Sequence, residues 1–454
     1  MLLMLGIGFV ASRRQTLEGY FVNDRKTKML MILSSTVSTQ VGAAVVIGTV
    51  GVTYQYGIGF GIAASIAVIL GWIIVALVAG KIKAFGDRSG AFTIGDFYEH
   101  RYSKRTKYAA SAVLAIAIFF WMAVGFVALG GMFSVLTGWD MALMMPLAAG
   151  VTIVYSATGG IKADIYSDFI QFWMMLLLFI MLIPLGLSRI GGLEAFRSLA
   201  SSHFYLFTYG GPGLFFGVIF LAIPFSLVSM DVWQRIYASE SGETAKKAFT
   251  LAAIINPMFY IGATVIGLIA AIAFPRIAQD TALFTLMQAV LPPGLLGIGM
   301  ASLIAVVMSS LDSTIVMLST IATKDFYKSL INRSATQQQM LRTGKAAALI
   351  SSVTALGIAY AMPSIITLTI YGTSLILVFA PVIIGGLLWE RATEKAAILS
   401  IITGLGATFI FIPTVGEAGV LLAMISSTIA FMLASFFAGK PEGEHFHPAH
   451  QEPF

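Results

Sequence analysis

The chain has 454 residues, of which 58% are hydrophobic and only 11% are charged. Soluble domains carry about 25% charged residues, so these proportions exclude a soluble protein and indicate a chain that lies in lipid. There is no cysteine, which excludes a disulfide framework and thiolate chemistry. We therefore expect an all-α integral membrane protein.

The first apolar segment, residues 1–12, is short for a membrane span. As a helix it would rise about 16 Å, against a hydrocarbon core of about 30 Å, and Arg13 and Arg14 follow at once. No cleavable signal peptide is evident. We favour an N-terminus that has been truncated over a short first helix that enters from outside.

Longer apolar stretches follow in chain order, at about 29–55, 58–82, 107–136, 140–158, 164–188, 211–233, 247–275, 284–323, 343–361, 364–389, 394–413 and 416–438. With the first segment they predict about thirteen transmembrane helices. The stretch 284–323 exceeds one span, so we expect a re-entrant or surface piece before its helix. A polar tail follows at 440–454, and its histidines fit a disordered terminus better than a metal site.

The positive charges set the orientation, because Lys and Arg collect in cytoplasmic loops. If the loop after the first segment is cytoplasmic, all of the 27 Lys and Arg lie inside except Arg189, Arg197 and Arg276. We therefore expect a multi-pass protein of the inner (cytoplasmic) membrane with its C-terminus in the cytoplasm. Topology explains the basic residues, and nothing indicates nucleic-acid binding.

Two of the predicted spans are interrupted. The second has a run of small polar residues from Ser34 to Gly42, and the seventh begins with Gly-Gly-Pro-Gly at Gly210 and contains Pro224. They are five helices apart, so they would occupy equivalent positions in two five-helix halves. Such interruptions point to a transporter's binding site near the middle of the membrane, although Gly and Pro are common in membrane helices generally.

The ninth span gathers hydroxyls and a carboxylate on one side of a helix. Ser309, Ser310, Asp312 and Ser313 cover an arc of about 160°. Oxygen ligands suit a hard cation such as Na⁺, and the lack of Cys and of His at this depth argues against a transition metal. Serines also bond to their own helix or pack between helices, but a buried carboxylate must be paired, protonated or bound to a cation.

The sixth and seventh spans add further carboxylates. We expect Asp164 to reach the cytoplasmic surface near Lys162, and Asp168 to lie one turn deeper, without a basic partner. For Asp231 we favour an i, i+4 ion pair with Arg235, with a substrate-facing or coupling role as the alternative.

Asp312 and Asp168 are expected at different depths in the membrane, measured from the lysines at the cytoplasmic ends of their helices. Asp312 lies about 18 Å along its helix from Lys324, whereas Asp168 lies only about 9 Å from Lys162. They meet only if the ninth helix projects into the cytoplasm or the loop at Gly159-Gly160 is tucked into the protein.

No catalytic constellation is evident. The sequence has no nucleotide-binding loop, no Ser-His-Asp arrangement and no His/Cys cluster within the membrane, so we do not expect an enzyme. Trp121 could stack on a substrate, but we favour a packing or lipid-facing role for it.

Five local patterns together resemble the sodium/solute symporter family, whose members carry sugars, amino acids, vitamins and organic acids. In chain order they are Thr16 to Phe21 with Asp24-Arg25, Tyr155 to Gln171, Trp233-Gln234-Arg235, Ser309-Ser310-x-x-Ser313 with Asp325, and Pro381 to Trp389. The resemblance spans nearly the whole chain.

The resemblance implies one integral-membrane transporter domain over residues 1–454. Its core would be a LeuT-like 5+5 inverted repeat of ten helices at about 29–389. The remaining segments would be flanking helices at 1–12, 394–413 and 416–438 and the polar tail at 440–454.

The resemblance also implies a sodium site between the broken second helix and the ninth. By position, its ligands would be the backbone carbonyls and hydroxyls of Ser38, Val41, Val306, Ser309 and Ser310. Some members have a second sodium site, which here would use Asp168, Asp312 and Ser313. Those members have hydroxyls at the last two positions, so Asp312 departs from the pattern. Two carboxylates could bind Na⁺ more tightly or share a proton, and the stoichiometry stays open.

We therefore expect a Na⁺-coupled secondary active symporter that imports a small organic solute by alternating access. The solute would lie beside the broken segments, against Gln40, Ala43, Ala44, Ser229 and Asp231. The alternatives are a proton-coupled transporter that uses Asp168 and Asp312, and a transporter-like membrane sensor. The apparent lack of a membrane-embedded base mildly disfavours strongly acidic solutes.

Overall fold

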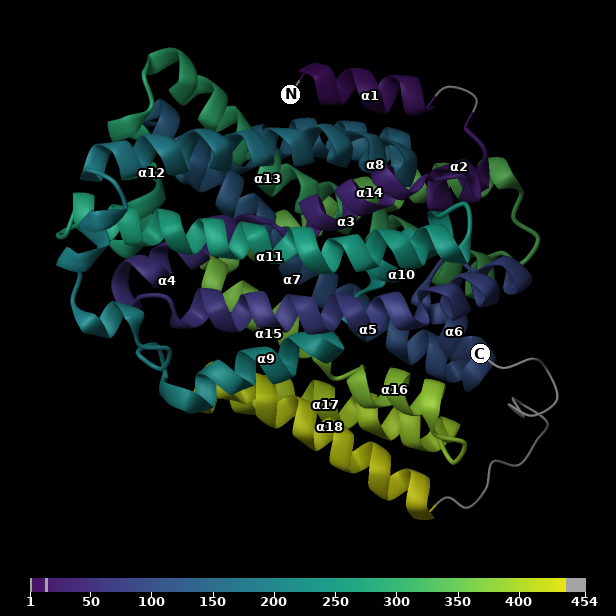
Figure 1. Ribbon diagram of the computed structural model, residues 1–454. Coiled ribbons are helices and arrows are strands. Elements are labelled where there is room, and N and C mark those ends of the chain that lie inside the picture. Colours follow the sequence, from purple (N-terminus) through teal and green to yellow (C-terminus); the bar gives the residue numbers. More distant parts are fainter. Residues whose placement is uncertain (1, 13–14, 438–454) are drawn as a thin grey trace.

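The computed structural model describes residues 2–12 and 15–437, so the tail at 440–454 lies outside the described residues. Long helices lie side by side in one bundle (Figure 1). The α-helices are α1 Leu2–Ser12, α2 Leu17–Val22, α3 Met29–Gln40, α4 Thr49–Tyr56, α5 Gly59–Ser89, α6 Ile94–Arg101, α7 Lys104–Thr137, α8 Met141–Ile190, α9 Gly211–Val228, α10 Met230–Ala238, α11 Gly242–Ala273, α12 Ala282–Val290, α13 Pro293–Thr320, α14 Gln337–Ala361, α15 Ile365–Leu377, α16 Ala380–Leu388, α17 Glu394–Val415 and α18 Ala418–Phe437. Short 3-10 or π-helical turns are η1 Asn23–Arg25, η2 Ala44–Gly48, η3 Leu193–Ser198, η4 Ser201–Phe204, η5 Gln279–Thr281 and η6 Ile321–Ile331.

The described residues contain 10 helical segments long and apolar enough to cross a membrane, or 11 if the bent pair α3 and η2–α4 is one span. α8 has 50 residues, and a straight helix of that length would rise about 75 Å, far beyond the hydrocarbon core. A non-helical Gly160 divides it into arms at 141–159 and 161–190. The all-α membrane class is confirmed, and the count of about thirteen spans stays a prediction.

The predicted break in the second span is present. α3 ends at Gln40, the helix restarts at Ala44, and the two parts are bent by 53°. A Cβ added to Gly42 would lie 2.4 Å from the hydroxyl of Ser310, so a larger residue would displace this hydroxyl from its position against the break. The break and its contact with α13 therefore depend on each other.

The seventh span is also broken, but not where its glycines and proline suggested. Pro224 lies within α9, and the chain leaves helical geometry at Ser229 (φ −68°, ψ 123°) before α10 begins. The indole nitrogen of Trp233 donates to the carbonyl of Leu227 at 2.8 Å and satisfies an acceptor near the break. A tertiary contact thus stabilises a break that neither Gly nor Pro marks.

The stretch 284–323 divides as predicted. The short helix α12 comes first, and Leu291 and Pro292 separate it from α13, which begins at Pro293 and contains the predicted hydroxyl arc.

A buried ionic network joins η6, the continuation of α13, to α6 and α7. Asp325 accepts hydrogen bonds from the hydroxyls of Thr93 (2.9 Å) and Ser111 (2.8 Å). The Lys107 ammonium lies 3.4 Å from Asp325 and 2.7 Å from Asp96. The shared ammonium and the two hydroxyl donors thus connect this end of α13 to α6 and α7.

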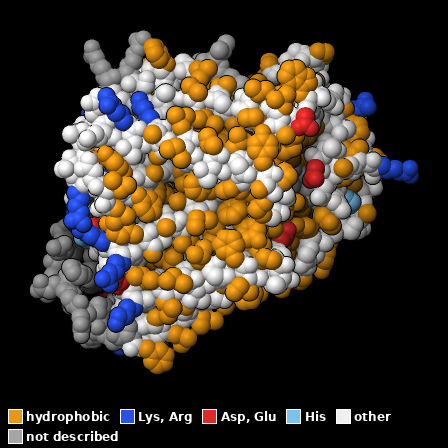
Figure 2. Space-filling view, turned by 180° about the vertical axis from the view of Figure 1, so that it is seen from behind, with side chains coloured by type: hydrophobic (Ala, Val, Ile, Leu, Met, Phe, Trp, Pro, Cys, Tyr) orange, Lys and Arg blue, Asp and Glu red, His pale blue; other side chains and the backbone are white. Residues whose placement is uncertain are grey.

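The molecular surface is divided by type of side chain. Figure 2 shows hydrophobic side chains across the middle and most of the visible Lys and Arg gathered at one end. Leu77, Ile180 and Phe409 are among the large apolar residues that remain exposed. A lipid-facing belt with basic residues at one rim fits the predicted orientation.

Candidate functional site

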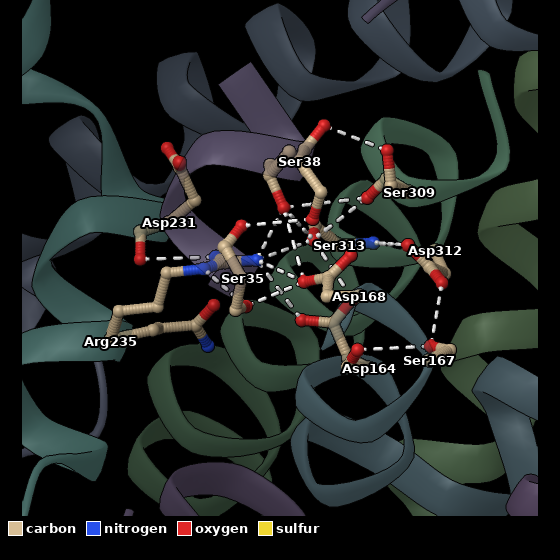
Figure 3. A network of polar contacts seen from close by, with 12 residues as sticks. Ser35, Ser38, Asp164, Ser167, Asp168, Asp231, Arg235, Ser309, Asp312 and Ser313 are labelled. Carbon is tan, nitrogen blue, oxygen red and sulfur yellow. Dashed lines mark hydrogen bonds and ion pairs between the residues drawn. The ribbon is translucent and has the colours of Figure 1, made fainter. Parts of the chain in front are cut away.

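Helices α3, α8, α10 and α13 meet around a polar network in the interior (Figure 3). Ser309 on α13 donates to the carbonyl of Ser38 on α3 at 2.8 Å, and its oxygen also lies 2.8 Å from the Val306 carbonyl. Ser310 donates to the carbonyl of Thr39 at 2.7 Å. The structure thus brings together most of the first predicted sodium site, and adds Thr39, which sequence reasoning missed.

These oxygens have the chemistry that Na⁺ requires. The last carbonyls of a helix have no partner within it, and the break after Gln40 frees those of Ser38 and Thr39 inside the protein. Val41 follows in non-helical geometry (φ −89°, ψ 62°). Neutral hydroxyl and carbonyl oxygens are hard ligands, so this donor set fits a sodium ion.

A cluster of carboxylates lies one turn further along α13. Asp164, Asp168 and Asp312 are buried, and their carboxylate oxygens lie within 4.8 Å of one another. The expectation that Asp164 reaches the cytoplasmic surface is therefore wrong. Gly160 has φ 60°, and a Cβ there would lie 2.4 Å from the carbonyl oxygen of Tyr20. The loop is tucked into the protein, which resolves the conflict of depths between Asp168 and Asp312.

Arg235 is the basic partner of the carboxylate cluster, whereas the sequence analysis had paired it with Asp231. Its Nη2 lies 3.0 Å from Asp168 and 3.3 Å from Asp164, and it donates to the hydroxyl of Ser313 at 2.8 Å. Its Nε donates to Ser35 at 2.8 Å. The expectation that Asp168 lacks a basic partner is thus wrong.

The predicted ion pair between Asp231 and Arg235 is also wrong. Arg235 reaches Asp231 only at its backbone carbonyl, 3.3 Å from Nη1. The Asp231 carboxylate points away from the guanidinium (Figure 3) and accepts from the amide nitrogen of Gln40 at 2.8 Å. The break at Ser229 starts a separate helix directed at α8, and helical spacing alone did not predict this course.

Asp312 lies at the other side of the cluster. It accepts from the hydroxyl of Tyr155 at 2.5 Å, lies 3.3 Å from the hydroxyl of Ser167, and accepts from the backbone nitrogen of Ser313 at 2.9 Å. Among the described residues no Lys or Arg forms an ion pair with it. The three residues of the second predicted site therefore lie together, but Asp164 and Arg235 share their cluster.

All five residues predicted to contact the solute line one cavity of about 230 Å³ beside the break in α3. These are Gln40, Ala43, Ala44, Ser229 and Asp231. Ser310 also lines the cavity, so the serine site and the cavity share a wall. Most of the other lining residues are apolar, and they include the aromatic Trp72, Phe225 and Trp121, for the last of which we had favoured a packing or lipid-facing role.

Comparisons with known proteins agree with this geometry. The sequence model of the Sodium:solute symporter family matches residues 20–404. The sodium/pantothenate symporter of Haemophilus influenzae is 27% identical over 94% of this chain and 91% of its own length. The high-affinity proline transporter of Bacillus subtilis is 25% identical over 96% and 95%.

Solved structures show the same fold. A substrate-bound, outward-open Na⁺-coupled sialic acid symporter superposes with a TM-score of 0.83 at 18% identity, over 97% of each chain. The nucleobase-cation-symport-1 family transporter Mhp1 superposes at 0.64 with 13% identity, over 95% of this chain and 96% of its own. The predicted LeuT-like architecture is confirmed, and the chain belongs to the sodium:solute symporter family.

Proposed function

We propose that this chain imports a small organic solute together with Na⁺, by alternating access, and that the ion binds between α3 and α13. The observation that carries this proposal is the contact of Ser309 and Ser310 with the freed carbonyls of Ser38 and Thr39, at 2.8 and 2.7 Å. By position, the Val41 and Val306 carbonyls would complete the ligand set.

The hydroxyl oxygens of Ser309 and Ser310 can bind Na⁺ when the ion is present and can donate to the α3 carbonyls when it is absent. A hydroxyl both donates and accepts, so each serine can turn its proton away from the carbonyl and offer its oxygen to Na⁺. The bound ion would then hold α3 to α13. Gln40, Ala43 and Ala44 follow the ion ligands directly along the chain and line the cavity. Ion binding would thereby fix the wall against which the solute binds.

We further propose that the carboxylate cluster holds a second cation. If all three were ionised, Asp164, Asp168 and Asp312 would carry three negative charges against the one positive charge of Arg235. Buried charges are costly unless they are compensated, and Asp168 Oδ1 is buried without a hydrogen-bond partner among the described residues. With Ser313, these oxygens would hold Na⁺ or, in the alternative, a proton.

The test of the ion site uses Ser310→Ala. We expect Na⁺ to raise the unfolding temperature of the purified wild-type protein and to drive uptake of labelled proline or pantothenate into proteoliposomes, and the variant to lose both responses. The matched control is Ser302→Ala, because Ser302 bonds only to the Ile298 carbonyl of its own helix. A wild-type Na⁺ response in Ser310→Ala would refute the assignment. Uptake that persists without Na⁺ at fixed pH would favour proton coupling.

We propose that the protein lies in the inner membrane with its C-terminus in the cytoplasm. The lack of native cysteine makes single-cysteine labelling clean. In intact cells a membrane-impermeant maleimide should label Arg189→Cys but not Lys246→Cys. The opposite pattern would reverse the orientation.

A further inference from the structure

The cavity beside the break in α3 has one charged side chain in its wall. That side chain is Asp231; within the part of the chain that the structure describes, no Lys, Arg or His lines the cavity, and its other polar residues, such as Gln40 and Ser229, are uncharged. Most of the remaining wall is aliphatic or aromatic. A solute that fills this cavity must therefore accommodate a carboxylate within a largely apolar surface.

Among the described residues no base forms a direct ion pair with this carboxylate, although the charge of Arg235 acts on it at longer range. The Arg235 guanidinium is directed at Asp164 and Asp168, and Figure 3 shows the Asp231 carboxylate turned away from it. The one donor that reaches the carboxylate among the described residues is Gln40 Nε2, 2.8 Å from Oδ2. An ionised carboxylate offers about four lone-pair positions, so most of its capacity is left for an occupant of the cavity.

A carboxylate in such a place selects for positive charge. Burial of an ionised group costs free energy unless a counter-charge accompanies it. A protonated amine supplies both the charge and N–H donors in short, charge-assisted hydrogen bonds. Trp72, Trp121 and Phe225 also line the cavity, and aromatic rings attract the same kind of cation.

We propose that the co-transported solute carries a protonated amino group, which binds Asp231 and Gln40, and an apolar body that packs against the aromatic wall. This inference rests on the proposed function, because it places the solute in the cavity that adjoins Ser310. Amino acids, imino acids and simple amines meet the requirement. Polyols, and solutes without an amine such as pantothenate, do not.

The first test uses matched solutes that differ only at the amino group. The pairs are L-proline with tetrahydrofuran-2-carboxylate, and L-leucine with 2-hydroxy-4-methylpentanoate; pantothenate and myo-inositol complete the set. Unfolding temperature is measured in NaCl and in KCl. We expect at least one amine to stabilise the protein in NaCl and its amine-free partner to have no effect. The proposal is overturned if no amine stabilises, or if an amine-free solute stabilises as much.

The second test removes the charge with Asp231→Asn, which preserves side-chain size. We expect affinity for the amine to fall at least about tenfold, the scale of one charge-assisted contact. Asp280→Asn, at an exposed carboxylate, should leave it unchanged. Wild-type amine affinity in Asp231→Asn overturns the proposal.

The two proposals fail in different ways. Asp231→Asn should keep the rise in unfolding temperature that Na⁺ causes without solute, which shows that the variant folds and its ion site is intact. If it does not fold, the matched pairs on wild-type protein decide. Loss of the Na⁺ response in wild-type protein counts against the ion site rather than against the amine.

Discussion

The serine site lies within one turn of Asp312, the member of the carboxylate cluster on α13. The two sites differ in charge: the serine site contains neutral groups, and the cluster contains ionisable ones. Around Ser309 and Ser310 every contact is between neutral dipoles. Around Asp168 full charges are buried, and Arg235 compensates part of them permanently. Neutral hydrogen bonds contribute about 1 kcal/mol each, whereas breaking a buried ion pair costs about 3–5 kcal/mol. If the serine site binds Na⁺ as proposed, the ion would be released at a small cost in free energy, whereas loss of the arginine from the carboxylate cluster would cost more.

The largest effect should follow from Arg235→Met, which leaves Asp164 and Asp168 without their cation. We expect the free energy of unfolding to fall by about 3–5 kcal/mol, measured by denaturation in detergent. Adding Asp168→Asn should recover part of the loss, because it removes one uncompensated charge. Arg197→Met, at an exposed pair with Glu194, should change stability by less than about 0.5 kcal/mol. Equal losses of stability in the two variants would show that the buried ion pairs of Arg235 contribute no more than an exposed pair.

A smaller effect is expected from Gly42→Ala. The new methyl would meet the Ser310 hydroxyl at 2.4 Å and displace it from the Thr39 carbonyl, to which it donates. Overpacking of this kind costs about 1–3 kcal/mol, and the Na⁺-induced rise in unfolding temperature should disappear. Gly48→Ala is the control, since nothing lies within 4 Å of a Cβ there. A retained Na⁺ response in Gly42→Ala would show that the close contact is dispensable.

The smallest change in stability is expected from Ser309→Ala, about 1 kcal/mol for one lost hydroxyl contact with Ser38. The Na⁺ response should nevertheless be lost, because the removed oxygen is a proposed ligand. Thermal unfolding in KCl measures the change in stability, and the difference between NaCl and KCl measures the Na⁺ response. A variant as responsive as the wild type would exclude Ser309 from the ion site.

Asp312→Asn sharpens the comparison without a large change in stability. The amide oxygen can still accept from Tyr155, but the charge is gone. If the cluster holds a second Na⁺, the Na⁺ dependence of uptake should become less steep, with a Hill coefficient nearer one. The Na⁺ dependence of the Ser302→Ala protein should match that of the wild type. An unchanged Hill coefficient would leave the serine site as the single site of coupling.

Local features were predicted from the residues themselves, and the contacts between distant segments that were predicted came from the family resemblance, while those of Arg235 and Asp164 were missed. The arc of Ser309 and Ser310 follows from helical geometry, and the run before Gly42 marked the break that faces it. The partner of Arg235 was missed because Ser229, neither Gly nor Pro, begins a new helix there. Asp164 was misplaced because its burial depends on the backbone turn at Gly160.

The continuity of α13 with η6 joins two distant regions mechanically. Ile321, where the two meet, has helical geometry (φ −58°, ψ −52°), and Asp325 lies about 24 Å along the axis from Ser309. At that end the ion pairs of Lys107 with Asp96 and Asp325 hold η6 against α6 and α7. A tilt of α13 that separates Ser309 and Ser310 from α3 would therefore strain the ion pairs of Lys107. Loss of those ion pairs would in turn make such a tilt easier. An ion bound at Ser309 and Ser310 as proposed would therefore influence contacts about 24 Å away, at the other end of the same helix.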